Sequence, residues 1–154
     1  MVIEKMLIRK AAEEDLPFIV KLLANDPLGK KREYYQDPLP ESYLKAFSEI
    51  NADKNNFLAV MEDNGVIIGT LQLTFIPYLT YKGGKRALIE GVRIDESYRG
   101  KGIGKQLIEW AIEKSRQLGC HMVQLTTDKK RPDALEFYKK LGFIASHEGL
   151  KLFF

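Results

Sequence analysis

Three glycines at alternate positions, Gly100, Gly102 and Gly104, follow Arg99 and precede an amphipathic stretch. Glycine leaves the backbone bare, and here it does so where a helix is expected to begin. The first N–H groups of a helix have no partner within it, and the helix dipole adds partial positive charge at the same end. The spacing therefore predicts an anion site, and most directly a phosphate site.

Two common phosphate-binding patterns do not fit this segment. Counted from Gly100, both the Walker pattern and the dinucleotide fingerprint need a glycine at the position that Lys105 occupies. The pattern present is Arg-x-x-Gly-x-Gly, formed by Arg99, Gly102 and Gly104. It resembles the pyrophosphate-binding signature of the GCN5-related N-acetyltransferases, the GNAT family.

Two further segments carry the same resemblance. The approach from Val92 to Gly100 resembles the family's lead-in, although Glu96 stands where proline is frequent. The block from Ala134 to Phe143 looks like the family's late helix and the turn after it. The motifs cover only residues 90–104 and 131–143, whereas the order of elements is similar over nearly the whole chain.

The resemblance implies acetyl-CoA as cosubstrate. Its pyrophosphate is expected in the glycine-rich segment, and its pantetheine arm along the preceding strand, as an added strand would lie. Gly91 suits a bulge or a close backbone approach there. The residues expected to bind the cosubstrate are Val92, Arg93, Ile94, Arg99, Gly100, Lys101, Gly102, Ile103 and Gly104.

Acetyl transfer to an amine needs two proton transfers. An alkyl ammonium, with a pKa near ~10, must lose a proton, and the departing thiolate must be protonated or otherwise stabilised. The resemblance places the phenol of Tyr138 near the sulfur, where it would act as the acid. The alternative is a core aromatic, because Tyr138 also has helix-core spacing with Leu135 and Leu141.

Glu90 is the candidate base, acting directly or through water. It lies among apolar residues of the expected central strand, and burial there would favour its protonated form. The alternative is an exposed glutamate on a strand. No metal is expected, since His121 and His147 lack metal-ligand spacing to Cys120.

Composition narrows the class of protein. The chain has 154 residues, 45% of them hydrophobic, which predicts a single domain over residues 1–154. A net charge of +3 is too small to indicate a nucleic-acid partner. There is no apolar run long enough to span a membrane and no signal peptide in Met1–Lys5, so we expect a cytoplasmic protein with no membrane partner.

Periodicity and turn residues predict the elements that position these groups. A long loop over residues 25–40 and a turn at 76–85 are expected to shape the acceptor site, and their mixed charges favour neither an acidic nor a basic acceptor. The expected strands are 5–9, 57–61, 66–75, 86–94, 121–127, 143–145 and 150–154. The expected helices begin near residues 13, 41, 105 and 132.

This order predicts an α/β fold of the GNAT (acyl-CoA N-acyltransferase) type, with a mixed, mostly antiparallel central sheet flanked by helices. The resemblance implies an acetyl-CoA-dependent N-acetyltransferase in which a primary amine attacks the thioester directly. We expect a small-molecule amine. The alternatives are a protein or peptide amine, or a CoA-binding regulatory protein without activity.

The end of the chain suggests an assembly. Residues 150–154 form an apolar run that would be a poor free edge as a strand. On a strand, Phe153 and Phe154 face opposite sides, so burying both takes two apolar surfaces. We therefore expect a homodimer, the commonest oligomer symmetry being two-fold.

Overall fold

The computed structural model describes residues 6–154, which form two compact units. The first ends at Gln124 and the second runs from Leu125 to Phe154. Residues 1–5 lie outside the description, and with them the expectations for the N-terminal segment and for Lys5 as the start of a strand.

A five-stranded sheet forms the centre of the first unit. Its strand order is β1-β2-β3-β4-β5, with three antiparallel pairings followed by a parallel pairing of β4 with β5. The mixed, mostly antiparallel sheet is thus as expected. The strands are β1 (Leu7–Lys10), β2 (Asn56–Asp63), β3 (Val66–Pro77), β4 (Lys85–Ile94) and β5 (Met122–Gln124).

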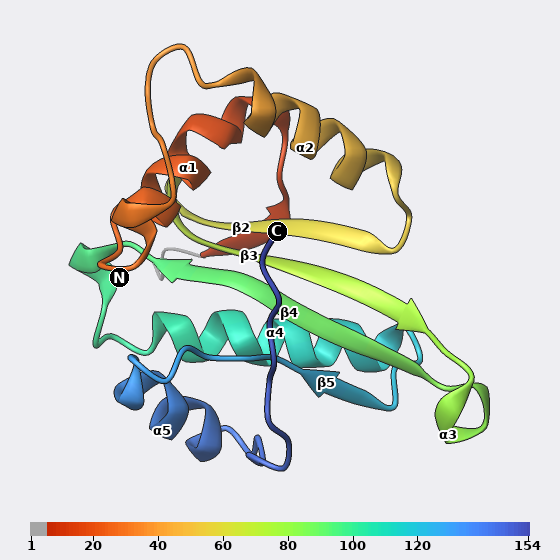
Figure 1. Cartoon of the computed structure of the whole chain (residues 1–154). Helices are drawn as coiled ribbons and strands as arrows, with labels where there is room; N and C mark the ends of the chain where they lie inside the picture. Colours follow the sequence, from red (N-terminus) through yellow and green to blue (C-terminus); the bar gives the residue numbers. More distant parts are fainter. Residues whose placement is uncertain (1–5) are drawn as a thin grey trace. The chain divides into compact units, whose positions relative to one another are not determined.

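Helices cover both faces of this sheet. Figure 1 shows α1 (Leu16–Ala24) and α2 (Glu41–Ala52) on one side, and α4 (Ile103–Gln117) on the other. Because both faces are covered, β2 carries a continuous buried run over Ala59–Met61 in place of alternating burial. The short elements of this unit are η1 (Glu13–Asp15), η2 (Gly29–Lys31), α3 (Thr80–Gly83) and η3 (Glu96–Tyr98).

Apolar spacing explains how α4 attaches. Its buried apolar residues are Ile103, Leu107, Ile108 and Ala111, which share one face of a helix with 3.6 residues per turn. On the same helix the Trp110 ring lies 5.6 Å from that of Phe57 on β2. This packing fixes the helix along the sheet, and its N-terminal end is thereby fixed just after β4.

The second unit contains one helix, α5 (Pro132–Lys140), with proline in its first turn as expected. The expected final hairpin, Phe143–Ala145 with Leu150–Phe154, is wrong, because no strand is formed over these residues. Their side chains include exposed Ile144, Leu152 and Phe154. An isolated two-stranded hairpin this short is only marginally stable unless it extends a larger sheet. This low stability is the physical reason why the expected hairpin is not formed.

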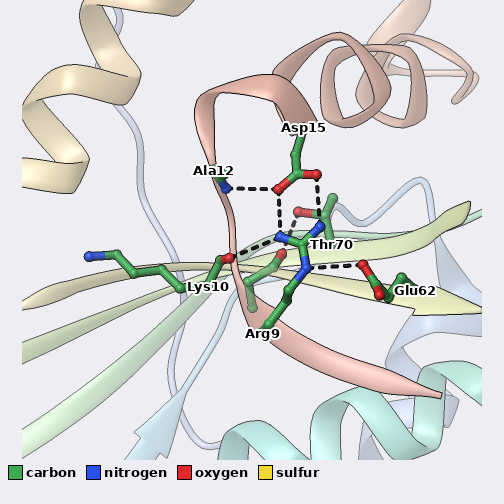
Figure 2. A network of polar contacts seen from close by, with 7 residues as sticks. Arg9, Lys10, Ala12, Asp15, Glu62 and Thr70 are labelled. Carbon is green, nitrogen blue, oxygen red and sulfur yellow. Dashed lines mark hydrogen bonds and ion pairs between the residues drawn. The ribbon is translucent and has the colours of Figure 1, made fainter. Parts of the chain in front are cut away.

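A charged network fixes the first connection of the fold (Figure 2). The guanidinium of Arg9 donates to both carboxylate oxygens of Asp15, at 2.7 and 2.9 Å, and its Nε donates to Glu62 at 3.0 Å. The backbone N–H of Ala12 also donates to Asp15, at 2.7 Å. The Arg9 hydrogen bond holds the pKa of the Asp15 carboxyl below its usual value, while burial acts in the opposite direction.

Replacing Asp15 with asparagine is therefore expected to lower the free energy of unfolding by about 2 kcal/mol at neutral pH. Since the folded pKa is depressed, this stabilisation is present above the unfolded pKa of about 3.9 and is lost as pH falls through the folded value. Urea unfolding of wild type and variant at several pH values measures it. The exposed neighbour Glu13, changed to glutamine, is the control, and a difference that persists unchanged at pH 2 would contradict the assignment.

Candidate active site

The site begins at a bulge in β4. Between the pairs Thr70–Arg93 and Gln72–Glu90, two residues of β4 stand opposite one of β3. Gly91 adopts φ +61° there, a left-handed conformation that glycine takes without strain. The bulge that Gly91 suggested in the sequence is thus present, and it bends β4 at its second half.

Beyond this point β4 has an open edge. The parallel pairing with β5 covers only Arg86, Ala87 and Leu88, and β5 ends at Gln124, shorter than expected (Figure 1). Within the first unit, no strand pairs with Ile89–Ile94 on the side away from β3. An extended ligand can add to such an edge through main-chain hydrogen bonds.

The chain then makes a short, firmly held approach to α4. Asp95 accepts from the N–H and hydroxyl of Ser97, at 2.9 and 2.5 Å, and these bonds lower the pKa of its carboxyl. The hydroxyl of Tyr98 donates to Asp63 at 2.9 Å, which ties the approach to the hairpin between β2 and β3. Sequence patterns did not identify Asp63 or Tyr98 as anchors, because this contact joins segments that are far apart along the chain.

The glycine-rich segment leaves its N–H groups available. Within residues 6–154, the backbone N–H groups from Gly100 to Lys105 donate to no acceptor, and the next, Gln106, donates to Gly102 at 3.1 Å. Gly100 and Gly102 have φ of +73° and +78°, and a Cβ at either would meet nothing within 4 Å. The N–H groups, the helix dipole and the open space together suit an anion.

Charged side chains of this segment have defined contacts. Arg99 donates from Nε to the carbonyl of Ile94 at 3.2 Å, so it holds the end of β4. The Lys101 ammonium lies 5.5 Å from the centre of the Tyr98 ring. Ile103 is buried, so its contribution to a ligand is restricted to its backbone.

The two candidate catalytic residues lie in different units. Glu90 is on β4 next to the bulge, and it is exposed, which is the alternative of an exposed strand glutamate and not the buried carboxylate. Alternation explains this: Ala87 and Ile89 point into the core, and Glu90 faces the other way. Tyr138 is half-buried on α5 in the second unit, with ring centres of Phe137 and Phe143 at 5.1 and 5.7 Å.

The two segments expected near the acceptor differ in position. The end of α1 lies beside the bulge, since a Cβ built at Gly91 would be 3.9 Å from Leu23 Cδ2. The connection 25–40 starts from there. The 76–85 turn precedes β4, about 20 Å along the strand from Gly91. Within the first unit, the open edge is therefore adjacent to the start of the connection and distant from the turn.

Comparison with known proteins agrees with this geometry. The Acetyltransferase (GNAT) family profile matches residues 20–143. The chain is 41% identical over 91 residues to glucosamine 6-phosphate N-acetyltransferase of Trypanosoma brucei brucei, covering 59% of this chain and 60% of that protein. It is 30% identical over 140 residues to aminoalkylphosphonate N-acetyltransferase of Salmonella typhimurium, covering 91% and 86%.

A solved structure is more similar still. The crystal structure described as a transcriptional regulator from Bacillus halodurans C-125 is 59% identical, with a TM-score of 0.95, covering 97% of this chain and all of that one. No helix within residues 6–154 is long and apolar enough to cross a membrane. The family profile spans the open edge of β4, the glycine-rich segment 99–104 (the cradle) and α5. The chain therefore belongs to the acetyltransferase (GNAT) family, in agreement with the acyltransferase class that its motifs predict.

Proposed function

We propose that the chain is an acetyl-CoA-dependent N-acetyltransferase for a small-molecule primary amine, formed as one functional domain over residues 1–154 and located in the cytoplasm. The observation that carries the proposal is the open edge of β4 leading directly into unpaired N–H groups at the start of α4. That arrangement fits an extended arm ending in a pyrophosphate.

The residues proposed to hold acetyl-CoA are those that the motifs indicated. Val92, Arg93 and Ile94 would bind the arm through their backbone, and residues 99–104 would bind the pyrophosphate. When bound, acetyl-CoA supplies an activated acetyl thioester. Glu90 would accept the proton of the ammonium, directly or through water, and its exposed carboxylate is accessible for that role.

The relatives support the choice of a small acceptor. Their names give the substrates as glucosamine 6-phosphate and aminoalkylphosphonate, both small amines with an anionic phosphorus group. In this chain, the connection beside the bulge carries exposed Lys30 and Lys31, whose charges suit such a group, although Arg32 pairs with Glu33 at 3.3 Å and the connection as a whole is mixed in charge. An amine panel that follows CoA release tests the proposal, with 2-aminoethylphosphonate, glucosamine 6-phosphate, their phosphorus-free analogues and a lysine peptide.

One observation favours a second candidate. The similar structure from Bacillus halodurans is described as a transcriptional regulator, and this description favours the alternative that the present chain is a CoA-binding regulatory protein without activity. The same panel separates the two functions. CoA binding with no turnover of any amine would favour the regulator, whereas turnover of an amine establishes the enzyme.

If Glu90 accepts the amine proton, Glu90→Gln is expected to lower kcat/KM about 10²-fold at pH 7 and progressively less toward pH 10. At high pH the free amine already exists in solution, because its pKa is near ~10. A pH–rate profile with the best amine of the panel measures this. Glu109→Gln, a change of an exposed glutamate on α4, is the control, and an equal loss at every pH would instead indicate a positional role.

We also propose a homodimer that buries the end of the chain. Leu150, Leu152 and Phe153 are exposed in the structure, and such a cluster of large apolar side chains is typical of an interface. Sedimentation at micromolar concentration is expected to give twice the mass of one chain. Deleting residues 151–154 is expected to yield a monomer, and a wild-type species with the mass of one chain would contradict the proposal.

A further inference from the structure

A buried ion pair joins the start of the connection 25–40 to the bulged part of β4. Arg93 Nη2 lies 3.6 Å from Asp26 Oδ2, and the two side chains are 11% and 5% exposed. By contrast, Lys105 and Glu109 of α4, which also form an ion pair, are more than half exposed. The pair is therefore removed from water, unlike an ordinary surface pair.

Each partner has a second contact that orders its own backbone. Asp26 Oδ2 accepts from the N–H groups of Leu28 and Gly29, at 3.1 and 2.9 Å, which shapes the turn after α1. Arg93 Nη1 donates to the carbonyl of Val92 at 2.7 Å, immediately after the bulge. The pair thus links a turn of the connection to the strand segment that is open to a ligand.

The turn is packed too closely to shift freely. A Cβ at Gly29 would lie 1.9 Å from the carbonyl oxygen of Leu23, so the backbone of the turn lies directly against the end of α1. Leu23 in turn lies beside Gly91. The end of α1, the turn and the bulge therefore form one continuous contact within the first unit.

Stability alone is a weak reason for such a pair. Removing two charges from water is costly, and well-packed apolar residues in their place are often equally stable or more stable. A buried pair can instead specify one arrangement among several. Here the arrangement in question is that of the connection relative to the open edge of β4.

We propose that Asp26 is a positioning residue for the transfer reaction. Through Arg93 it holds the start of the connection 25–40 at a fixed place beside the open edge of β4, where amine and thioester must meet. The inference rests on the proposed function of this edge. Asp26 itself would touch neither substrate, since its carboxylate is engaged by the turn and by Arg93.

Hydrogen exchange with and without CoA tests the link. In the wild type, saturating CoA is expected to slow exchange in peptides covering 99–106 and, through Arg93, on the order of tenfold in peptides covering 25–34. Asp26→Asn keeps an oxygen for the turn but removes the charge. The variant is expected to retain slowing at 99–106 and to lose it at 25–34, a pattern that a purely structural role would not produce.

Three further measurements make the test decisive. Asp15→Asn removes a carboxylate of the same kind from the pair with Arg9, and it is expected to leave the effect of CoA at 25–34 unchanged. The double variant Asp26→Asn/Arg93→Met leaves no unbalanced buried charge, so it is expected to fold and still lose the effect. With the best panel amine, kcat of Asp26→Asn is expected to fall about 10²-fold while CoA affinity is retained.

The outcomes separate this inference from the proposed function. No slowing at 99–106 in the wild type would overturn the CoA site and with it the proposed function. Slowing at 99–106 with none at 25–34, or full slowing at 25–34 in Asp26→Asn, would overturn only the positioning role of Asp26.

Discussion

Replacing Gly102 with aspartate is expected to weaken CoA binding by on the order of 10²-fold or more. Gly102 has φ +78°, and a Cβ there would project into open space at the N-terminal end of α4, where the pyrophosphate is proposed to lie. An aspartate adds a negative charge next to a negative ligand, and such a juxtaposition costs about 3 kcal/mol or more. Calorimetric titration with CoA measures the change in Kd.

Two variants separate charge from backbone strain. Gly102→Ala places a Cβ at the same positive φ without the charge, and it is expected to have a much smaller effect on Kd. Gly119→Asp repeats both the charge and the φ of +78° after the C-terminal end of the same helix, again with nothing within 4 Å of the Cβ. It is expected to leave Kd unchanged. Equal weakening by Gly102→Asp and Gly119→Asp would mean that the loss comes from the fold of α4.

The cradle could be predicted from the sequence because its determinants are local. Gly100 and Gly102, just before an amphipathic helix, specify positive φ values and unpaired N–H groups within six residues of chain. The bulge at Gly91 follows from the same kind of signal. The antiparallel pairing of β2 with β3 could be predicted as well, since the short turn at Asn64-Gly65 joins the two strands as a hairpin.

Features that depend on distant partners could not be predicted. Asp26 stands in an ordinary turn context, before Pro27 and near Gly29, and nothing local indicates that Arg93 is its partner. The apolar neighbours of Glu90 left open whether it is buried or exposed, and the strand alternation places its side chain on the opposite face from Ile89, where it is exposed. The final hairpin was inferred from apolar runs, whose pairing depends on a sheet edge that the second unit does not supply.

Replacing Tyr138 with phenylalanine is expected to lower kcat by on the order of 10²–10⁴-fold, which is the typical contribution of a general acid. The proposed role of the hydroxyl is to donate a proton to the departing sulfur. Phenylalanine keeps the ring, so contacts with Phe137 and Phe143, at ring-centre distances of 5.1 and 5.7 Å, are retained. The change therefore removes the hydroxyl while preserving the packing of α5 and the turn after it.

Single-turnover kinetics with the best amine of the panel measure this effect on the chemical step alone. CoA affinity is expected to stay within about twofold, since a loss confined to the transition state lowers kcat without weakening ground-state binding. Tyr81→Phe removes an exposed hydroxyl before β4 and serves as the matched control, with no expected change in rate. An unaltered single-turnover rate in Tyr138→Phe would assign Tyr138 to the apolar packing of the second unit, and another group would then have to protonate the sulfur.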